Sequence, residues 1–194
     1  MPKEVAKGLM KDNSAREIFK DVQANIERAL KTQLTVVVCG PAKASAPKSR
    51  GHLREAVRRS LKTDQVIFLE ELLASPEGQE VMTLLKEKLQ RPLELDQIEI
   101  LILKANTIDK DVHIVEGAGA IAELVKFEAD NDVSKKIYAF VNERYRNKRS
   151  FLEQSVFTRL IRAERLYWFK NETDLKSKVK SALNPNRISK SGIL

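Results

Sequence analysis

The stretch DVHIVEGAGAIAELVKF, residues 111–127, decides the fold that the sequence predicts. It begins with a short apolar run, passes through a turn that contains Gly117 and Gly119, and ends in a segment with helical spacing. A short buried strand, a glycine turn and a helix in this order are typical of one unit of a parallel α/β sheet. We therefore expect a strand over 111–115 and a helix from about 120 to 129.

Four more apolar runs have the composition of strands, and segments with helical periodicity separate them. The predicted strands are residues 34–39, 65–69, 136–141 and 165–169, and the further predicted helices are residues 52–63, 76–90, 94–108, 151–163 and 172–183. Strands that alternate with helices form βαβ units with right-handed crossovers. The predicted fold is therefore an α/β fold, a doubly wound five-stranded parallel sheet of the flavodoxin-like order 2-1-3-4-5.

Residues 94–108 permit two interpretations. The run IEILIL has the composition of a strand, but the span is long for a strand. Its apolar residues also share one face of a helix, at Ile98, Leu101, Ile102, Ala105 and Ile108. We interpret the segment as a helix.

The chain is expected to have three parts. Residues 1–32 form an N-terminal helical appendage, in which residues 13–32 carry one apolar stripe. Residues 33–185 form the α/β domain, and residues 186–194 form a polar tail that contains no acidic residue.

Composition narrows the classes of function. The 194 residues carry a formal net charge of +8, which permits a polyanionic partner, and aromatic residues make up only 6%, which argues against a single-strand binder that relies on stacking. The single cysteine, Cys39, permits no intrachain disulfide, and no segment resembles a signal peptide or a membrane span. We therefore expect a cytoplasmic protein without a membrane partner.

Motif spacing argues against several chemistries. The chain has two histidines, one cysteine and no metal-ligand spacing, so the sequence predicts no metal site. It also has no phosphate-binding loop of the ATPases and no Gly-x-Gly-x-x-Gly after the first strand. An ATPase or an ordinary dehydrogenase is therefore not expected, and the sequence predicts no bound cofactor.

In a sheet of this order, ligands bind beyond the carboxyl ends of the strands, between strands one and three. Three of the seven glycines fall at those two strand ends, Gly40 together with Gly117 and Gly119, and Gly40 is followed by Pro41. We take these four residues as substrate-binding candidates, although βα turns favour glycine in any case.

Carboxylates surround the same edge. Glu116 ends the third strand, Glu70 follows the second, and Glu123 lies about one turn into the helix after the glycines. A carboxylate near a helix N-terminus stays ionised, and it can attack a sugar carbon or stabilise an oxocarbenium ion. We predict Glu123 and Glu116 as catalytic and Glu70 as substrate-binding; the alternative is a solvated helix face. Glu128, five residues after Glu123, is expected to matter neither for activity nor for folding.

Basic residues follow the first strand. Lys43, Lys48 and Arg50 could meet a substrate phosphate or nucleic acid. Further basic residues cluster over 144–149 and 176–190. These clusters either bind nucleic acid through its phosphates or form solvated faces.

The stretch EILILKANTIDKDVHIVEGAGAIAELVKF, residues 99–127, resembles the nucleoside 2-deoxyribosyltransferase-like branch of the Rossmannoid superfamily. TIR domains are similar, since they also carry a Glu-Leu pair, here Glu123-Leu124, on the helix after the third strand. The opening TVVVCGPAKAS, residues 35–45, looks like the nucleotide-facing first strand and loop of these proteins.

The resemblance implies cleavage or transfer at the N-glycosidic bond of a nucleoside, a nucleotide or NAD. NAD would in that case be a substrate and not a cofactor. It implies that Glu123 is the nucleophilic or charge-stabilising glutamate and that Gly117 and Gly119 form the turn before it. Such proteins occur as antiviral effectors, often as homo-oligomers or with a partner protein.

The turn before the Glu-Leu pair departs from the family, and this departure supports a second hypothesis of function. The transferases place an acidic residue and Gly-Thr before the Glu-Leu pair to hold a sugar hydroxyl, whereas this chain has Glu116 followed by Gly-Ala. The missing hydroxyl favours a non-catalytic module that senses a nucleotide or docks a partner, with nucleic acid on its basic face. The position of Glu123 favours the enzyme.

Overall fold

The structure is a computed structural model that describes residues 32–40, 52–89, 95–146 and 151–192. The chain divides into two compact units, one of residues 34–182 and one of residues 1–33 with 183–194. The predicted helical appendage falls almost wholly outside the described residues, so the division into appendage, α/β domain and tail stays a prediction. The account below concerns the unit of residues 34–182 unless stated.

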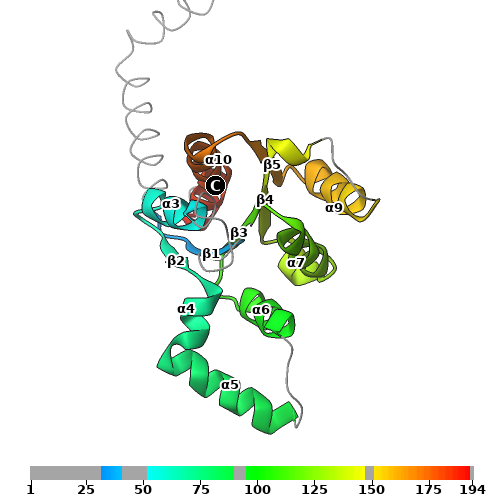
Figure 1. The fold of residues 1–194 in the computed structure, drawn as a ribbon. Coiled ribbons are helices and arrows are strands. Elements are labelled where there is room, and N and C mark those ends of the chain that lie inside the picture. Colours follow the sequence, from blue (N-terminus) through cyan, green and yellow to red (C-terminus); the bar gives the residue numbers. More distant parts are fainter. Residues whose placement is uncertain (1–31, 41–51, 90–94, 147–150, 193–194) are drawn as a thin grey trace, which may run out of the picture. The chain divides into compact units, whose positions relative to one another are not determined.

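Five strands form one parallel sheet in the order β2-β1-β3-β4-β5 (Figure 1). They are β1 (Thr35–Cys39), β2 (Gln65–Ile67), β3 (Lys110–Val115), β4 (Ile137–Asn142) and β5 (Leu166–Phe169). The predicted fold class and strand order are confirmed. The β-branched residues that predicted the strands are the reason that β1 and β3 lie in the middle, because both faces of these strands are buried.

Helices connect the strands. They are α3 (Leu53–Ser60), α4 (Leu69–Ala74), α5 (Pro76–Leu89), α6 (Leu95–Lys104), α7 (Ala118–Glu128), α8 (Asn131–Ser134), α9 (Phe151–Arg162) and α10 (Glu172–Lys190), and a 3-10 turn spans Glu143–Tyr145. The helix interpretation of 94–108 is confirmed by α6.

The helices cover both faces of the sheet (Figure 1). The core on one face combines α6, α7 and α9 with the inward residues of the strands, and its fully buried side chains include Leu103, Leu124, Phe127 and Leu160. Helix α3 and the first turns of α10 cover the other face, where Val57, Leu175 and Val179 are buried. Alternate residues of β3 therefore point to opposite layers, and Asp111 and His113 share the face of Val115.

Two boundaries differ from the prediction. The second strand ends at Ile67 and not at 69, because Phe68 is buried beneath Arg54 and Arg58 of α3, and α4 begins at Leu69. The last helix continues through Pro185 to Lys190, whereas the sequence predicted an end near 184. Within that last part, Asn184 accepts a hydrogen bond from Arg187 one turn later at 3.0 Å, which supports the helix across the proline.

None of the helices in the described part of the chain is both long enough and apolar enough to span a bilayer.

Candidate functional site

The carboxyl ends of the two central strands meet at one edge of the sheet. β1 ends at Cys39 and leads into Gly40, while β3 ends at Val115 and leads into Glu116 and the glycine turn. Cys39 is the register partner of His113, so the two strands run side by side up to this edge. The strand order reverses between β1 and β3, and this reversal makes the edge the expected ligand site.

Glu123 stands over this edge from the second turn of α7. Its side chain is 45% exposed, and its Oε2 lies 3.9 Å from Nε2 of His113. The carboxylate is therefore open to solvent on one side and faces a buried imidazole on the other. The catalytic role of Glu123 stays a prediction.

His113 is fully buried, and no sequence pattern selected it as a site residue. Its Nε2 lies 2.9 Å from the carbonyl oxygen of Ala120, and its ring packs edge-on against Phe127 with 5.8 Å between the ring centres. Its Nδ1 lies 3.5 Å from Oδ2 of Asp111, which is also fully buried. His113 thus lies between Asp111 and Glu123, and only its place in the sheet reveals this.

The charges around His113 change how it titrates. Burial alone would lower the pKa of the imidazole, but the carboxylates of Asp111 and Glu123 outweigh burial and raise it. Close by, burial and the Asp111 carboxylate raise the pKa of the Cys39 thiol well above its usual range. In the free protein the thiol is therefore protonated at neutral pH.

Glu116 is held firmly at the end of β3. Its Oε1 accepts a hydrogen bond from Nδ2 of Asn142 at 2.7 Å, and its Oε2 pairs with the guanidinium of Arg144. The hydroxyl of Tyr145 donates to the Glu116 carbonyl oxygen at 2.7 Å. The side chain is only 3% exposed, so Glu116 is fixed in position by partners from β4 and the turn after it.

A pocket of about 260 Å³ opens beside Glu116. It is lined by His52, Leu53, Glu116, Asn142, Arg144, Phe169, Asn171 and Glu172. The pocket brings together side chains from the carboxyl ends of β3, β4 and β5 with the start of α10. Glu123 is not part of this lining, so the two predicted catalytic glutamates do not share this pocket.

The three predicted glycines differ from one another. Gly40 has a φ of +135°, and a Cβ there would lie 2.7 Å from the carbonyl oxygen of Ile114. Gly117 has extended backbone, and at Gly117 and Gly119 a Cβ would meet no described atom within 4 Å. Packing of β1 against β3 therefore requires glycine at 40, whereas no described residue crowds the turn at 117–119.

The sequence suggested that Glu70 lies at the end of the second strand, but the structure places it in a helix. It lies in the first turn of α4, because β2 stops at Ile67, and its carboxylate pairs with the buried guanidinium of Arg54 at 2.6 Å. Burial opposes ionisation of Glu70, but the hydrogen bond from Arg54 prevails and lowers the pKa of the carboxyl. Arg54 also donates to the carbonyl oxygen of Gly40 at 3.4 Å, so Glu70 reaches the site edge only through Arg54.

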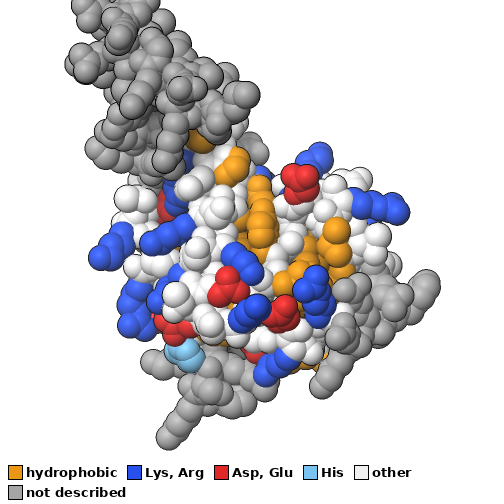
Figure 2. All heavy atoms as spheres, turned by 90° about the horizontal axis from the view of Figure 1, so that it is seen from above, with side chains coloured by type: hydrophobic (Ala, Val, Ile, Leu, Met, Phe, Trp, Pro, Cys, Tyr) orange, Lys and Arg blue, Asp and Glu red, His pale blue; other side chains and the backbone are white. Residues whose placement is uncertain are grey.

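Four predicted site residues, Pro41, Lys43, Lys48 and Arg50, lie outside the described residues. Their substrate, phosphate and nucleic-acid roles stay predictions. On the face in Figure 2, the Lys and Arg side chains are interspersed with Asp and Glu and form no continuous basic surface.

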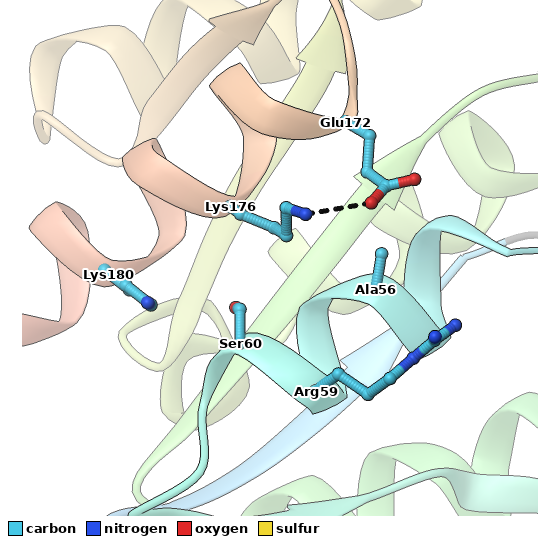
Figure 3. Close-up of a pocket in the computed structure, with 6 residues that line it drawn as sticks. All are labelled: Ala56, Arg59, Ser60, Glu172, Lys176 and Lys180. Carbon is cyan, nitrogen blue, oxygen red and sulfur yellow. Dashed lines mark hydrogen bonds and ion pairs between the residues drawn. The ribbon is translucent and has the colours of Figure 1, made fainter.

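A second pocket, of about 310 Å³, lies between α3 and α10. It is lined by Ala56, Arg59, Ser60, Glu172, Lys176 and Lys180 (Figure 3). Lys176 points toward Glu172 and pairs with it at 2.9 Å, as the dashed line shows. Three cationic side chains and one carboxylate give this pocket a net positive charge. Two of the cations, Lys176 and Lys180, belong to the basic cluster over 176–190.

Glu128 is not the neutral position that the sequence suggested. Its side chain is 5% exposed, and Oε2 accepts from Nε of Arg159 in α9 at 3.3 Å. Burial outweighs the attraction of Arg159 and raises the pKa of the carboxyl. Five residues after Glu123 the helix has turned into the core, which explains the difference.

Cys39, Asp111 and His113 form a buried cluster that spacing along the chain did not reveal. One potential ligand atom from each side chain lies within 4.8 Å of the others. The cluster joins β1 to β3 across 72 residues, and the register of the two strands brings it together.

A family model described as "STM3845 retron effector protein" matches residues 47–192. The match covers more than half of the chain and includes β3, the glycine turn and α7, with Asp111, His113, Glu116 and Glu123, whereas β1 and Cys39 precede it. A search of curated proteins finds no match to the chain.

Proposed function

Because the chain belongs to the STM3845 retron effector family, and so has a role in antiviral defence together with a retron system, we propose that it breaks the N-glycosidic bond of a nucleoside, a nucleotide or NAD. One observation carries the proposal. Glu123 presents a half-exposed carboxylate on the helix that follows the glycine turn, at the sheet edge where such folds bind ligands, with buried His113 3.9 Å away.

The reaction needs a negative charge at the sugar. When the bond between C1′ and the base nitrogen breaks, its electron pair leaves with the base, and positive charge develops on C1′ and the ring oxygen. The carboxylate of Glu123 stabilises that charge or attacks C1′. Water then adds its oxygen to C1′, and its proton balances the base, so the products are a free base and a sugar with a hydroxyl at C1′.

The neighbours of Glu123 give it a fixed setting. The carbonyl oxygen of Ala120 can only accept, so Nε2 of His113 carries the hydrogen, and this N–H edge also faces Glu123. Oε1 of Glu116 accepts from Nδ2 of Asn142 and Oε2 pairs with Arg144, so the carboxylate is held in a fixed position where it lines the pocket at the end of β3. Glu116 is therefore the residue that we propose accepts a sugar hydroxyl.

A second candidate is a non-catalytic module that senses a nucleotide or docks a partner. The observation in its favour is the pairing of Glu116 with both Asn142 and Arg144, because a carboxylate held in this way has less capacity left for a sugar hydroxyl. The basic residues would then contact nucleic acid, and homo-oligomers or a partner protein would form around the same fold.

Release of free base tests the enzyme proposal directly. Full-length protein, alone and together with the other components of its retron, is incubated with NAD and a panel of nucleotides, and free base is measured by chromatography. The Glu123→Gln variant keeps the volume of the side chain but removes its charge. We expect it to lose roughly 100- to 1,000-fold of the rate, since charge stabilisation in a sheltered site is worth about 3–4 kcal/mol.

The matched control is Glu80→Gln, since Glu80 is an exposed glutamate of α5 far along the chain from the site. Both variants are expected to unfold at the same temperature as the wild type, because an exposed polar substitution changes stability little. If no nucleotide yields free base but one binds to the protein, the sensing module is the better account. If base is released and Glu123→Gln is as active as Glu80→Gln, another carboxylate carries the reaction.

A further inference from the structure

Cys39, Asp111 and His113 offer three different ligand atoms in one buried place. Cys39 ends β1 and is the register partner of His113 in β3, and Asp111 lies two residues earlier on the same face of β3. Asp111 and His113 are fully buried, and Cys39 is 6% exposed. Thiolate, carboxylate and imidazole together are a donor set typical of zinc and related divalent ions.

The hydrogen bonding of this cluster is incomplete. Both carboxylate oxygens of Asp111 and Nδ1 of His113 lack a hydrogen-bond partner among the described residues, although the Nδ1–Oδ2 distance is 3.5 Å. A carboxylate taken out of water requires compensation, which buried acids find in a partner cation or a metal ion. Asp111 thus directs its carboxylate into the space that it shares with Cys39 and His113, with no hydrogen bond from a described residue to either oxygen.

The orientation of His113 suits a metal ligand. Its Nε2–H donates to the carbonyl oxygen of Ala120 at 2.9 Å, which fixes the tautomer and leaves the lone pair of the neutral ring on Nδ1, toward Asp111. Either a proton on Nδ1 or a metal ion can fill the place between this ring nitrogen and the carboxylate, and a metal ion would also reach the sulfur of Cys39. Metal-bound histidines usually have this arrangement, with the second ring nitrogen donating to a carbonyl or carboxylate.

We propose that Cys39, Asp111 and His113 bind a divalent transition-metal ion, zinc in particular, that joins the two central strands. The metal replaces the proton of the Cys39 thiol, which is released to solvent, and it neutralises Asp111. The fourth position is open to the second carboxylate oxygen of Asp111 or to water. This site is independent of the proposed glycosidic cleavage, although His113 connects the two places through Glu123.

Metal content of the full-length, tag-free protein is the first test. Protein purified without chelator and dialysed is analysed by mass spectrometry for metals, and we expect about one zinc ion per chain, as at other sites of three protein ligands. Replacement by cobalt should produce a thiolate-to-cobalt absorption band in the near ultraviolet. Both measurements use the wild type, so they hold even where a variant fails to fold.

Variants then assign the ligands. Cys39→Ser should abolish the cobalt–thiolate band, and Asp111→Asn should lower the metal content, whereas His52→Gln, which alters the other, exposed histidine, should change neither. A wild type that holds no stoichiometric metal as purified and gives no cobalt band would overturn the proposal. The cluster would then be a buried ion pair of His113 and Asp111. This outcome leaves the base-release experiment unaffected.

Discussion

Gly40 and Gly117 show how two glycines at one sheet edge meet different demands. Gly40 has a positive φ, and its Cα faces the Ile114 carbonyl so closely that a Cβ would come within 2.7 Å of the oxygen. Gly117 has an extended backbone that any residue adopts, and a Cβ there would meet none of the described residues within 4 Å. The sequence grouped both as substrate-binding, whereas packing explains the first and leaves the second without a packing reason.

We expect Gly40→Ala to lower the free energy of unfolding by about 1–3 kcal/mol, because it combines backbone strain with a clash against a central strand. Gly117→Ala should leave stability nearly unchanged. Urea denaturation of both variants measures the difference. Equal losses in the two variants would contradict this account of Gly40, and reduced base release in a stable Gly117→Ala protein would support a ligand over the turn.

At the scale of elements, α7 and α9 are joined by the contact of Glu128 with Arg159. The two helices pack through Phe127 and Leu160 in the core, and the ion pair lies beside them, with the acid buried and the guanidinium half exposed. Burial dominates, so the pKa of Glu128 is raised above its value in the unfolded chain. The packing of these helices therefore depends on pH.

Proton binding decides whether the free energy of unfolding rises or falls with pH. The folded protein binds the Glu128 proton more tightly than the unfolded chain, so this carboxyl costs no stability at low pH and lowers the free energy of unfolding as pH rises through the folded pKa. Relative to Glu128→Gln, the wild type should therefore lose stability as the pH rises from about 4.3, the usual pKa of a glutamate carboxyl, through the raised pKa of Glu128. Urea midpoints for the two proteins at several pH values in that range check it. A constant difference, or the opposite trend, would mean that Arg159 outweighs burial.

Most elements could be predicted because their apolar spacing is strong. The helical face of Ile98 and Ile102 identified α6 correctly although its composition also fits a strand. The errors lie at ends, where tertiary contacts decide. β2 stops early because Phe68 packs under two arginines of α3, and α10 passes Pro185, where local sequence alone predicted a stop.

At the scale of the whole molecule, alternation of strands and helices was enough to predict the sheet order, because few topologies satisfy right-handed crossovers. The candidate site could be predicted only in part from the sequence. Glu116 and Glu123 could be placed at the edge from strand ends, but the partners of Glu116 and the cluster of Cys39 with His113 depend on strand register and on long-range contacts. No spacing rule along the chain encodes these.

The sheet also predicts an order of local stability. β1, β3 and β4 each have a strand on both sides, whereas β2 has three residues, none of them fully buried, and lies at an edge. Hydrogen exchange should therefore be slowest for amides of β1, β3 and β4 and faster for Gln65–Ile67. Exchange in β2 as slow as in β3 would indicate that the β2 edge is covered in solution.

The register of β1 with β3 has a consequence for how the protein is made. Cys39 leaves the ribosome 76 residues before Val115, and synthesis at 5–20 residues per second puts about 4–15 s between them. During that interval the apolar β1 has no central neighbour, and the nascent chain exposes a strand that is prone to aggregation until a chaperone or its own β3 covers it. Since His113 and Glu123 belong to the later segment, a growing chain, or one that terminates before them, cannot assemble the proposed site.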